Sequence, residues 1–270
     1  MDKPLPQFKV TKIMDVGADH PIVKRLLLQF SHIIESGLID LPNSAKDRVK
    51  ALLFDLVQHM LRTEEALHHY AELEDTALKR LAEVKNEHDR VYSFDDPTLE
   101  LTKHFENFLI HAVIGVRDTC KMASAITGEK ITGPKDLITS LARVFTADTA
   151  VLEWLEDNKN WGKQLFDLRA LSEHGGLDVQ RFDVIGFKDD APVVRLPQLA
   201  TPYITLREYL NQTWPRLFFY CEDTVALLLS TKCKFPGVIV DLPENQWESR
   251  GGRRYVIELG YCVKQSQPEP

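Results

Sequence analysis

The sequence predicts a mainly α protein, a helical bundle with a long helical hairpin, followed by a small C-terminal α+β appendage. Residues 44–91 contain no Gly or Pro and are rich in Ala, Leu, Glu, Lys and Arg, which favour helices. Apolar residues then recur at helical spacing through residues 98–174. Beyond residue 176 the composition shifts to short β-branched and aromatic runs separated by polar turns, which is typical of hairpins.

The N-terminal segment, residues 1–43, is expected to contain one strand and one helix. Residues 8–16 alternate loosely between apolar and polar side chains, as a short strand does. Residues 21–36 place apolar side chains on one helical face, namely Ile22, Leu26, Leu27, Phe30 and Ile33. Gly37 and Pro42 then interrupt the chain.

A helical core is expected over residues 44–176. Its first helix has no breaker before residue 91, and this length indicates a protruding helical hairpin or a coiled-coil-like arm. Pro97 suits the first turn of the next helix. Glycines mark the later boundaries, because glycine readily adopts the left-handed conformation that ends a helix. These boundaries are Gly128, Gly133-Pro134 and Gly175-Gly176.

The appendage is expected over residues 177–264. It begins with a hairpin within residues 177–199. Residues 204–230 should form a helix that Pro215 kinks or splits, because proline lacks an amide hydrogen. The remaining elements are a second hairpin from residues 237–242 and 254–263, and a disordered tail at residues 265–270.

Composition limits the function classes. Of the 270 residues, 27% are charged, and the net charge is -7. An acidic chain of this kind argues against sequence-blind nucleic-acid binding, which needs a basic face, although a local basic patch is still allowed. The four cysteines form no C-x-x-C pair, so we expect reduced thiols. The N-terminus lacks an apolar signal segment and no apolar run is long enough to cross a bilayer, so we expect a cytoplasmic protein without membrane contact.

One short motif carries the sharpest chemical hypothesis. Arg169 and His174 form an R-x4-H arrangement at the end of a predicted helix, just before two glycines. An arginine can hold a phosphate and offset the charge that develops during in-line attack. A histidine titrates near neutral pH, so it can move the proton of a ribose hydroxyl. Neither role requires a metal or another cofactor, and we expect none.

The same segment resembles the HEPN families, whose members carry R-x4-6-H near the end of an all-helical bundle. The similarity covers residues 44–176 and includes a tryptophan, Trp161, before the motif. The resemblance implies a metal-independent endoribonuclease of a defence or toxin–antitoxin system, with RNA as its partner. In catalytic members two such motifs meet across a dimer, so the resemblance also implies a homodimer. Family members often place a polar residue after the arginine, where this chain has Ala170.

A second reading of the motif is structural. Positions i and i+5 of an ideal helix lie about 140° apart, so Arg169 and His174 do not share a face unless the helix frays. Arg169 would then pair with Asp167 or Glu173, and His174 would only close the helix. Arg62 is also followed at this spacing by His68 and His69, so the pattern arises by chance in this chain.

Two other patterns are weaker. Glu65 and His68 form an E-x-x-H pair, but a di-iron bundle needs a second pair, and we expect no metal site. A dense basic cluster, Arg250, Arg253 and Arg254, lies in the loop of the second hairpin and could contact phosphate, or could be a charged loop tip.

Two functions therefore remain open. The first is the HEPN-like ribonuclease, with Arg169 binding phosphate and His174 transferring protons. The second is a non-catalytic helical module that binds a protein, on the long hairpin, or a nucleotide. Convergence of Arg169 and His174 in an open groove favours the enzyme, and their separation favours the module.

Overall fold

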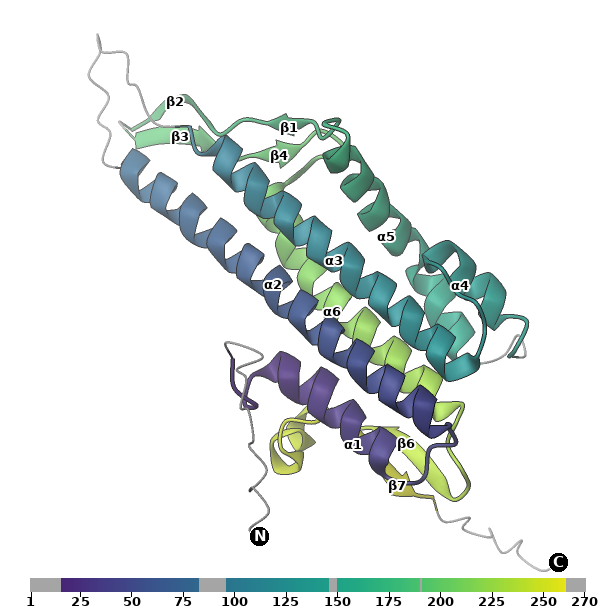
Figure 1. The fold of residues 1–270 in the computed structure, drawn as a ribbon. Coiled ribbons are helices and arrows are strands. Elements are labelled where there is room, and N and C mark those ends of the chain that lie inside the picture. Colours follow the sequence, from purple (N-terminus) through teal and green to yellow (C-terminus); the bar gives the residue numbers. More distant parts are fainter. Residues whose placement is uncertain (1–15, 83–95, 146–149, 190, 261–270) are drawn as a thin grey trace, which may run out of the picture.

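The computed structural model describes residues 16–82, 96–145, 150–189 and 191–260, and the fold is mainly α, as predicted. Long helices run side by side as a bundle along the molecule (Figure 1). These helices are α2 (Asn43–Ala82), α3 (Thr98–Thr127), α5 (Ala150–Glu173) and α6 (Leu206–Ser230). The short helix α4 (Pro134–Leu141) packs against both α3 and α5.

The long pair α2 and α3 lies within the bundle. The predicted long helical hairpin is confirmed, but within the described residues it does not protrude as an arm, because α2 also packs against α6. Side chains of α2 are buried along its whole length, including Leu53, Met60, Tyr70 and Leu81. The predicted continuation of this helix to residue 91 lies outside the described residues.

The predicted N-terminal helix is present. It starts as a π-helical segment, Val23–Leu28 (η1), and continues as α1 (Gln29–Glu35). Its inner face is completely buried at Leu26, Phe30 and Ile33. Most of the predicted strand at residues 8–16 lies outside the described residues.

Helix α6 is the predicted helix around Pro215, and it continues through this residue without being split. The residue whose carbonyl would lose its partner, Asn211, is exposed like Pro215 itself, so solvent can replace the missing hydrogen bond. The helix packs against α2, α3 and α5.

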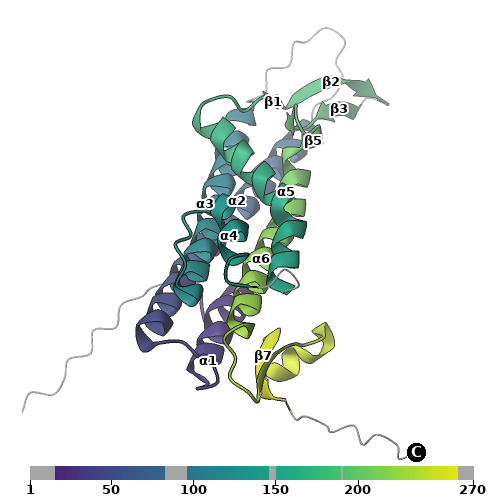
Figure 2. The same cartoon turned by 90° about the vertical axis from the view of Figure 1, so that its right-hand side faces the viewer.

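Both predicted hairpins are confirmed. The first consists of β2 (Asp183–Lys188) and β3 (Ala191–Arg195), at the end of the bundle where α2 ends and α3 begins. Beside it lies a small antiparallel sheet of β1 (Val179–Gln180), β4 (Gln198–Leu199) and β5 (Ile204–Thr205). The second hairpin pairs β6 (Gly237–Asp241) with β7 (Tyr255–Leu259) and packs on α1 (Figure 2). The loop between them contains two 3₁₀ turns, Glu244–Gln246 and Glu248–Arg250.

One hydrophobic core joins these parts. Trp161, Leu165 and Leu168 of α5 are buried in the same core as Phe105 and Phe108 of α3, as their spacing predicts. The core extends from the N-terminal helix to β7. The expected boundaries at residues 43 and 176 therefore fall inside shared packing. None of the helices in the described ranges is both long and apolar enough to cross a membrane.

Candidate functional site

Arg169 lies within helix α5, and His174 is the first residue after the helix ends. Arg169 forms an ion pair with Glu173, with Nη2 2.7 Å from Oε1. His174 is exposed, and its backbone N–H donates to the carbonyl of Ala170 at 3.2 Å. Within the described residues no contact joins the two side chains. The Arg169–Glu173 pair is the arrangement that the structural reading of the motif predicts.

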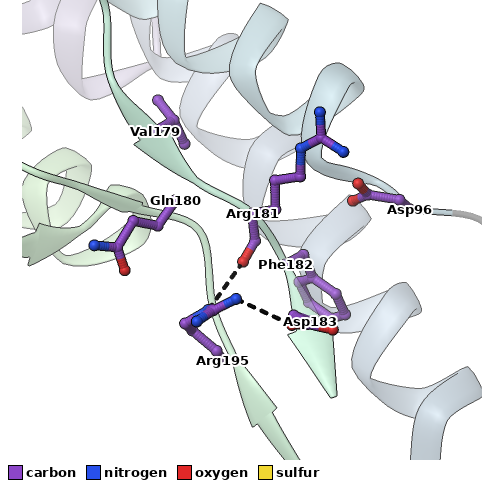
Figure 3. A pocket seen from close by; sticks show the side chains of 7 residues that line it. All are labelled: Asp96, Val179, Gln180, Arg181, Phe182, Asp183 and Arg195. Carbon is purple, nitrogen blue, oxygen red and sulfur yellow. Dashed lines mark hydrogen bonds and ion pairs between the residues drawn. The ribbon is translucent and has the colours of Figure 1, made fainter. Parts of the chain in front are cut away.

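An open depression lies beside β1 and β2, which follow α5 in the chain. It has a volume of about 610 Å³ and is lined by Asp96, Arg195 and the segment from Val179 to Asp183. Arg195 donates from Nη2 to Asp183 at 3.0 Å and from Nε to the carbonyl of Arg181 at 3.4 Å. The side chains of Arg181 and Arg195 point away from each other, and Arg181 lies on the side of Asp96 (Figure 3). The two guanidinium groups therefore do not converge on one anion.

The basic cluster in the second hairpin lies at the edge of a charged network. Arg254 donates to Asp241 through Nε at 3.0 Å and through Nη2 at 2.8 Å, and Nη1 donates to Asp223 at 2.6 Å. Arg250 contacts Glu258 at 3.5 Å and is exposed. Arg253 is partly exposed. The phosphate role proposed for these arginines stays a prediction, and Arg254 already directs its donors to carboxylates.

This network joins three distant parts of the chain. Glu222 of α6 is completely buried and accepts from Arg25 of the N-terminal helix, with Nε–Oε1 at 2.9 Å. Gln29 accepts from the backbone N–H groups of Arg254 and Tyr255, at 2.7 and 2.8 Å. Burial raises the pKa of Asp223, and the Arg254 guanidinium opposes that rise. Nothing in the sequence pattern pairs these residues, because they come from segments about 200 residues apart and share no motif.

A polar groove along helix α2 contains Arg62, His68 and His69, whose spacing the sequence analysis interprets as a chance match to the motif. The groove has a volume of about 550 Å³ and brings Arg62 together with His20, His68 and His69. Its wall also includes Glu64, Glu65 and Glu72, whose carboxylates disfavour a phosphate group there. Among the described residues no three His, Cys, Asp or Glu side chains are grouped as metal ligands.

A different cavity, partly open to solvent, lies between α4 and α5. Its volume is about 390 Å³, and α3 and α6 each contribute one wall residue, Val116 and Tyr220. The wall is mostly apolar and includes Leu137, Ile138, Leu155 and Phe166. Sequence reasoning missed this site, because its residues look like ordinary core positions on separate helices.

Two polar side chains of this cavity, Asn158 and Tyr220, lie among its apolar residues. Asn158 donates from Nδ2 to the carbonyl of Trp154 at 2.9 Å, and its Oδ1 accepts from Arg216 at 3.4 Å. Tyr220 packs against Trp161, with ring centroids 5.5 Å apart, and burial raises its pKa well above the usual range. Its hydroxyl makes no hydrogen bond to the part of the chain that the structure describes. Three lysines also line the cavity, Lys135, Lys159 and Lys163.

Comparison of the chain with protein-family models, with curated proteins and with solved structures gave no match.

Proposed function

We propose that the protein is a non-catalytic helical module that binds a small molecule in the cavity between α4 and α5. The observation that carries the proposal is this apolar space of about 390 Å³ among packed helices. Sites for small molecules are typically mainly apolar, contain a few well-placed polar groups, and occur between the helices of bundles. The cavity has each of these properties.

The chemistry of the wall favours binding over catalysis. Of the described residues that line the cavity, none is His or Cys. A tyrosine whose pKa is raised by burial keeps its proton at neutral pH, so Tyr220 can donate a hydrogen bond but is a poor general base. The carboxylates of Glu156 and Asp167 are paired with lysines, Glu156 with Lys159 at 3.3 Å and Asp167 with Lys163 at 2.8 Å.

The ribonuclease implied by the HEPN resemblance is the alternative proposal. It is supported by the helical bundle and by the exposed position of His174 at the end of α5. The ion pair between Arg169 and Glu173 weighs against it, because the arginine must leave this partner to hold a phosphate. The homodimer, the defence or toxin–antitoxin role, and a protein partner on the long hairpin stay predictions.

The proposal is tested with a neutral solvatochromic dye, Prodan, whose emission shifts to the blue in an apolar site. Gly162 lines the cavity, and a Cβ atom there would meet no atom within 4 Å. Gly162→Leu should fill the space and weaken dye binding by at least about ten-fold, the effect of losing roughly two buried methylenes. The matched control, Gly162→Ala, improves helix propensity similarly but adds little volume, so it should bind the dye like wild type. Equal binding by all three proteins would contradict the proposal.

A further inference from the structure

We infer that the cavity between α4 and α5 takes a small amphipathic anion, with an apolar chain inside and one acidic group at the lysine rim. This inference rests on the function proposed above, and it adds the chemical class of the ligand. Apolar side chains line the inner wall of this cavity, and its rim carries more lysines than carboxylates.

The inner wall is apolar. Val116, Leu137 and Leu155 come from three different helices and are each at most 2% exposed, so they form the closed floor of the cavity. Phe166 adds an aromatic face and is itself covered on one side by Arg117, whose guanidinium carbon lies 5.5 Å from the ring centroid. An enclosed apolar cavity of about 150 Å³ already accommodates benzene. The larger space here, about 390 Å³ and open to solvent on one side, has room for an alkyl chain of about ten carbons that lies along this floor.

The outer wall carries three lysines, Lys135, Lys159 and Lys163, and two carboxylates, Glu156 and Asp167, which leaves an excess of one positive charge. Lys159 and Lys163 are one helical turn apart on α5, with side chains 61% and 71% exposed. Each shares its charge with one carboxylate, whereas Lys135 has no ion pair within the described residues. Pro134 and Lys135 are the first residues of α4, and the N-terminal end of a helix carries partial positive charge. In a chain with net charge -7, this local excess of positive charge favours an anionic headgroup over a cationic one.

The hydrogen-bonding groups agree with this polarity. The side-chain amide of Asn158 is already hydrogen-bonded to Trp154 and Arg216, so it is not available to a ligand. The hydroxyl of Tyr220 is protonated at neutral pH and can donate to an acceptor in the ligand. With an excess of one positive charge at the rim and a hydroxyl donor at Tyr220, the cavity favours a carboxylate over an ammonium group.

The test compares three ligands with the same chain, decanoate, decanol and decylammonium, by isothermal titration calorimetry. We expect decanoate to bind tightest and decylammonium weakest. The advantage of decanoate over decanol should be about two- to five-fold per lysine contact, since the rim is solvent-exposed, and it should shrink as salt is added. Shortening the chain by one methylene should weaken binding about four-fold.

Replacing Lys135, Lys159 and Lys163 together by Gln should remove the advantage of decanoate over decanol. The control is Lys103→Gln, because Lys103 forms a comparable i,i+3 pair with Glu100 on α3, away from the cavity. If decanol or decylammonium binds as tightly as decanoate, and Gly162→Leu blocks them, the ligand class is wrong while the binding function stands. If none of the three ligands binds wild-type protein, and Prodan also fails, the binding function itself is wrong.

Discussion

The imidazole rings of His59 and His111 meet across the interface of α2 and α3, with their Nδ1 atoms 3.1 Å apart. Their ring centroids are 5.4 Å apart and the planes are inclined by 28°. At this distance one ring donates and the other accepts, so at least one nitrogen of the pair must be unprotonated. The pair is partly buried, and Asp118 on α3 lies near it, with Oδ2 4.0 Å from Nε2 of His59.

This geometry predicts a loss of stability in mild acid. Burial lowers the pKa of His59 and lowers that of His111 to about 4, and each ring is also depressed by nearby positive charge from Arg62. Asp118 and Asp55 oppose the shift of His59, and Lys121 adds to it. Because the unfolded histidines titrate near pH 6.5, the unfolded chain binds more protons below that pH. The stability contributed by the neutral pair is therefore present above about pH 6.5 and is lost as the pH falls toward 4.

Urea denaturation between pH 7.5 and 4.5 measures this effect. The wild-type protein should lose more unfolding free energy over this range than a His59→Gln/His111→Gln variant, which lacks both titrating groups. The exposed His68→Gln variant is the control and should follow the wild type. An identical loss in wild type and double variant would show that the pair does not couple protonation to folding.

The buried network predicts a large effect of Arg254. Removing its side chain by Arg254→Ala leaves Asp223 without this partner and Glu222 with one fewer cation. Breaking such a buried pair costs about 3–5 kcal/mol of unfolding free energy, because a charge remains buried without compensation. Arg250→Ala, in the same loop but exposed, should change stability by less than about 0.5 kcal/mol. Chemical denaturation of both variants decides whether Arg254 is structural.

The apolar stripe of α5 predicts a core effect at Leu165, which is completely buried. Leu165→Ala should cost about 2–5 kcal/mol, the sum of lost transfer energy and the cavity left behind. Leu171 lies on the same helix but is 46% exposed, so Leu171→Ala should stay within about 0.5 kcal/mol. Similar effects of the two substitutions on the denaturation midpoint would contradict the assignment of the stripe to the core.

The same helix allows the ribonuclease proposal to be tested directly. If the protein is a non-catalytic module, purified protein should leave RNA intact in the presence of EDTA, and His174→Ala should change nothing. If it is a metal-independent ribonuclease, the wild type should cleave RNA, and His174→Ala should slow cleavage by about 10²–10⁴-fold. Arg169→Lys should then also slow cleavage, because lysine cannot make the bidentate contact that arginine makes with a phosphate. Arg62→Ala should have little effect in either case.

Much of the fold follows from local sequence signals. Helix boundaries at Gly128, Pro134 and Gly175 were predictable, because each depends on the backbone preference of one residue. The position of α6 was not, because an apolar helix gives no indication of which neighbours bury it. The same holds for the long hairpin, where helix length alone suggests an arm, but α2 also packs against α6.

The candidate site was harder to predict than the fold. A motif such as Arg169 and His174 is visible because its members are adjacent in the sequence. The cavity combines Val116, Lys135, Gly162 and Tyr220, which are distant in sequence and ordinary in type. The network of Arg25, Glu222 and Arg254 is equally dispersed, and only tertiary packing brings it together. Sequence reasoning found the local chemistry and missed the sites made by packing.

The position of a bound ligand tests the central claim most directly. A crystal structure of the protein with 10-bromodecanoate locates the terminal bromine by its anomalous scattering. We expect one bromine peak beside Val116, Leu137 and Leu155, with the carboxylate directed toward the rim formed by Lys135 and Lys159. A bromine peak at the rim, a peak elsewhere on the protein, or an unoccupied cavity at saturating ligand would contradict it.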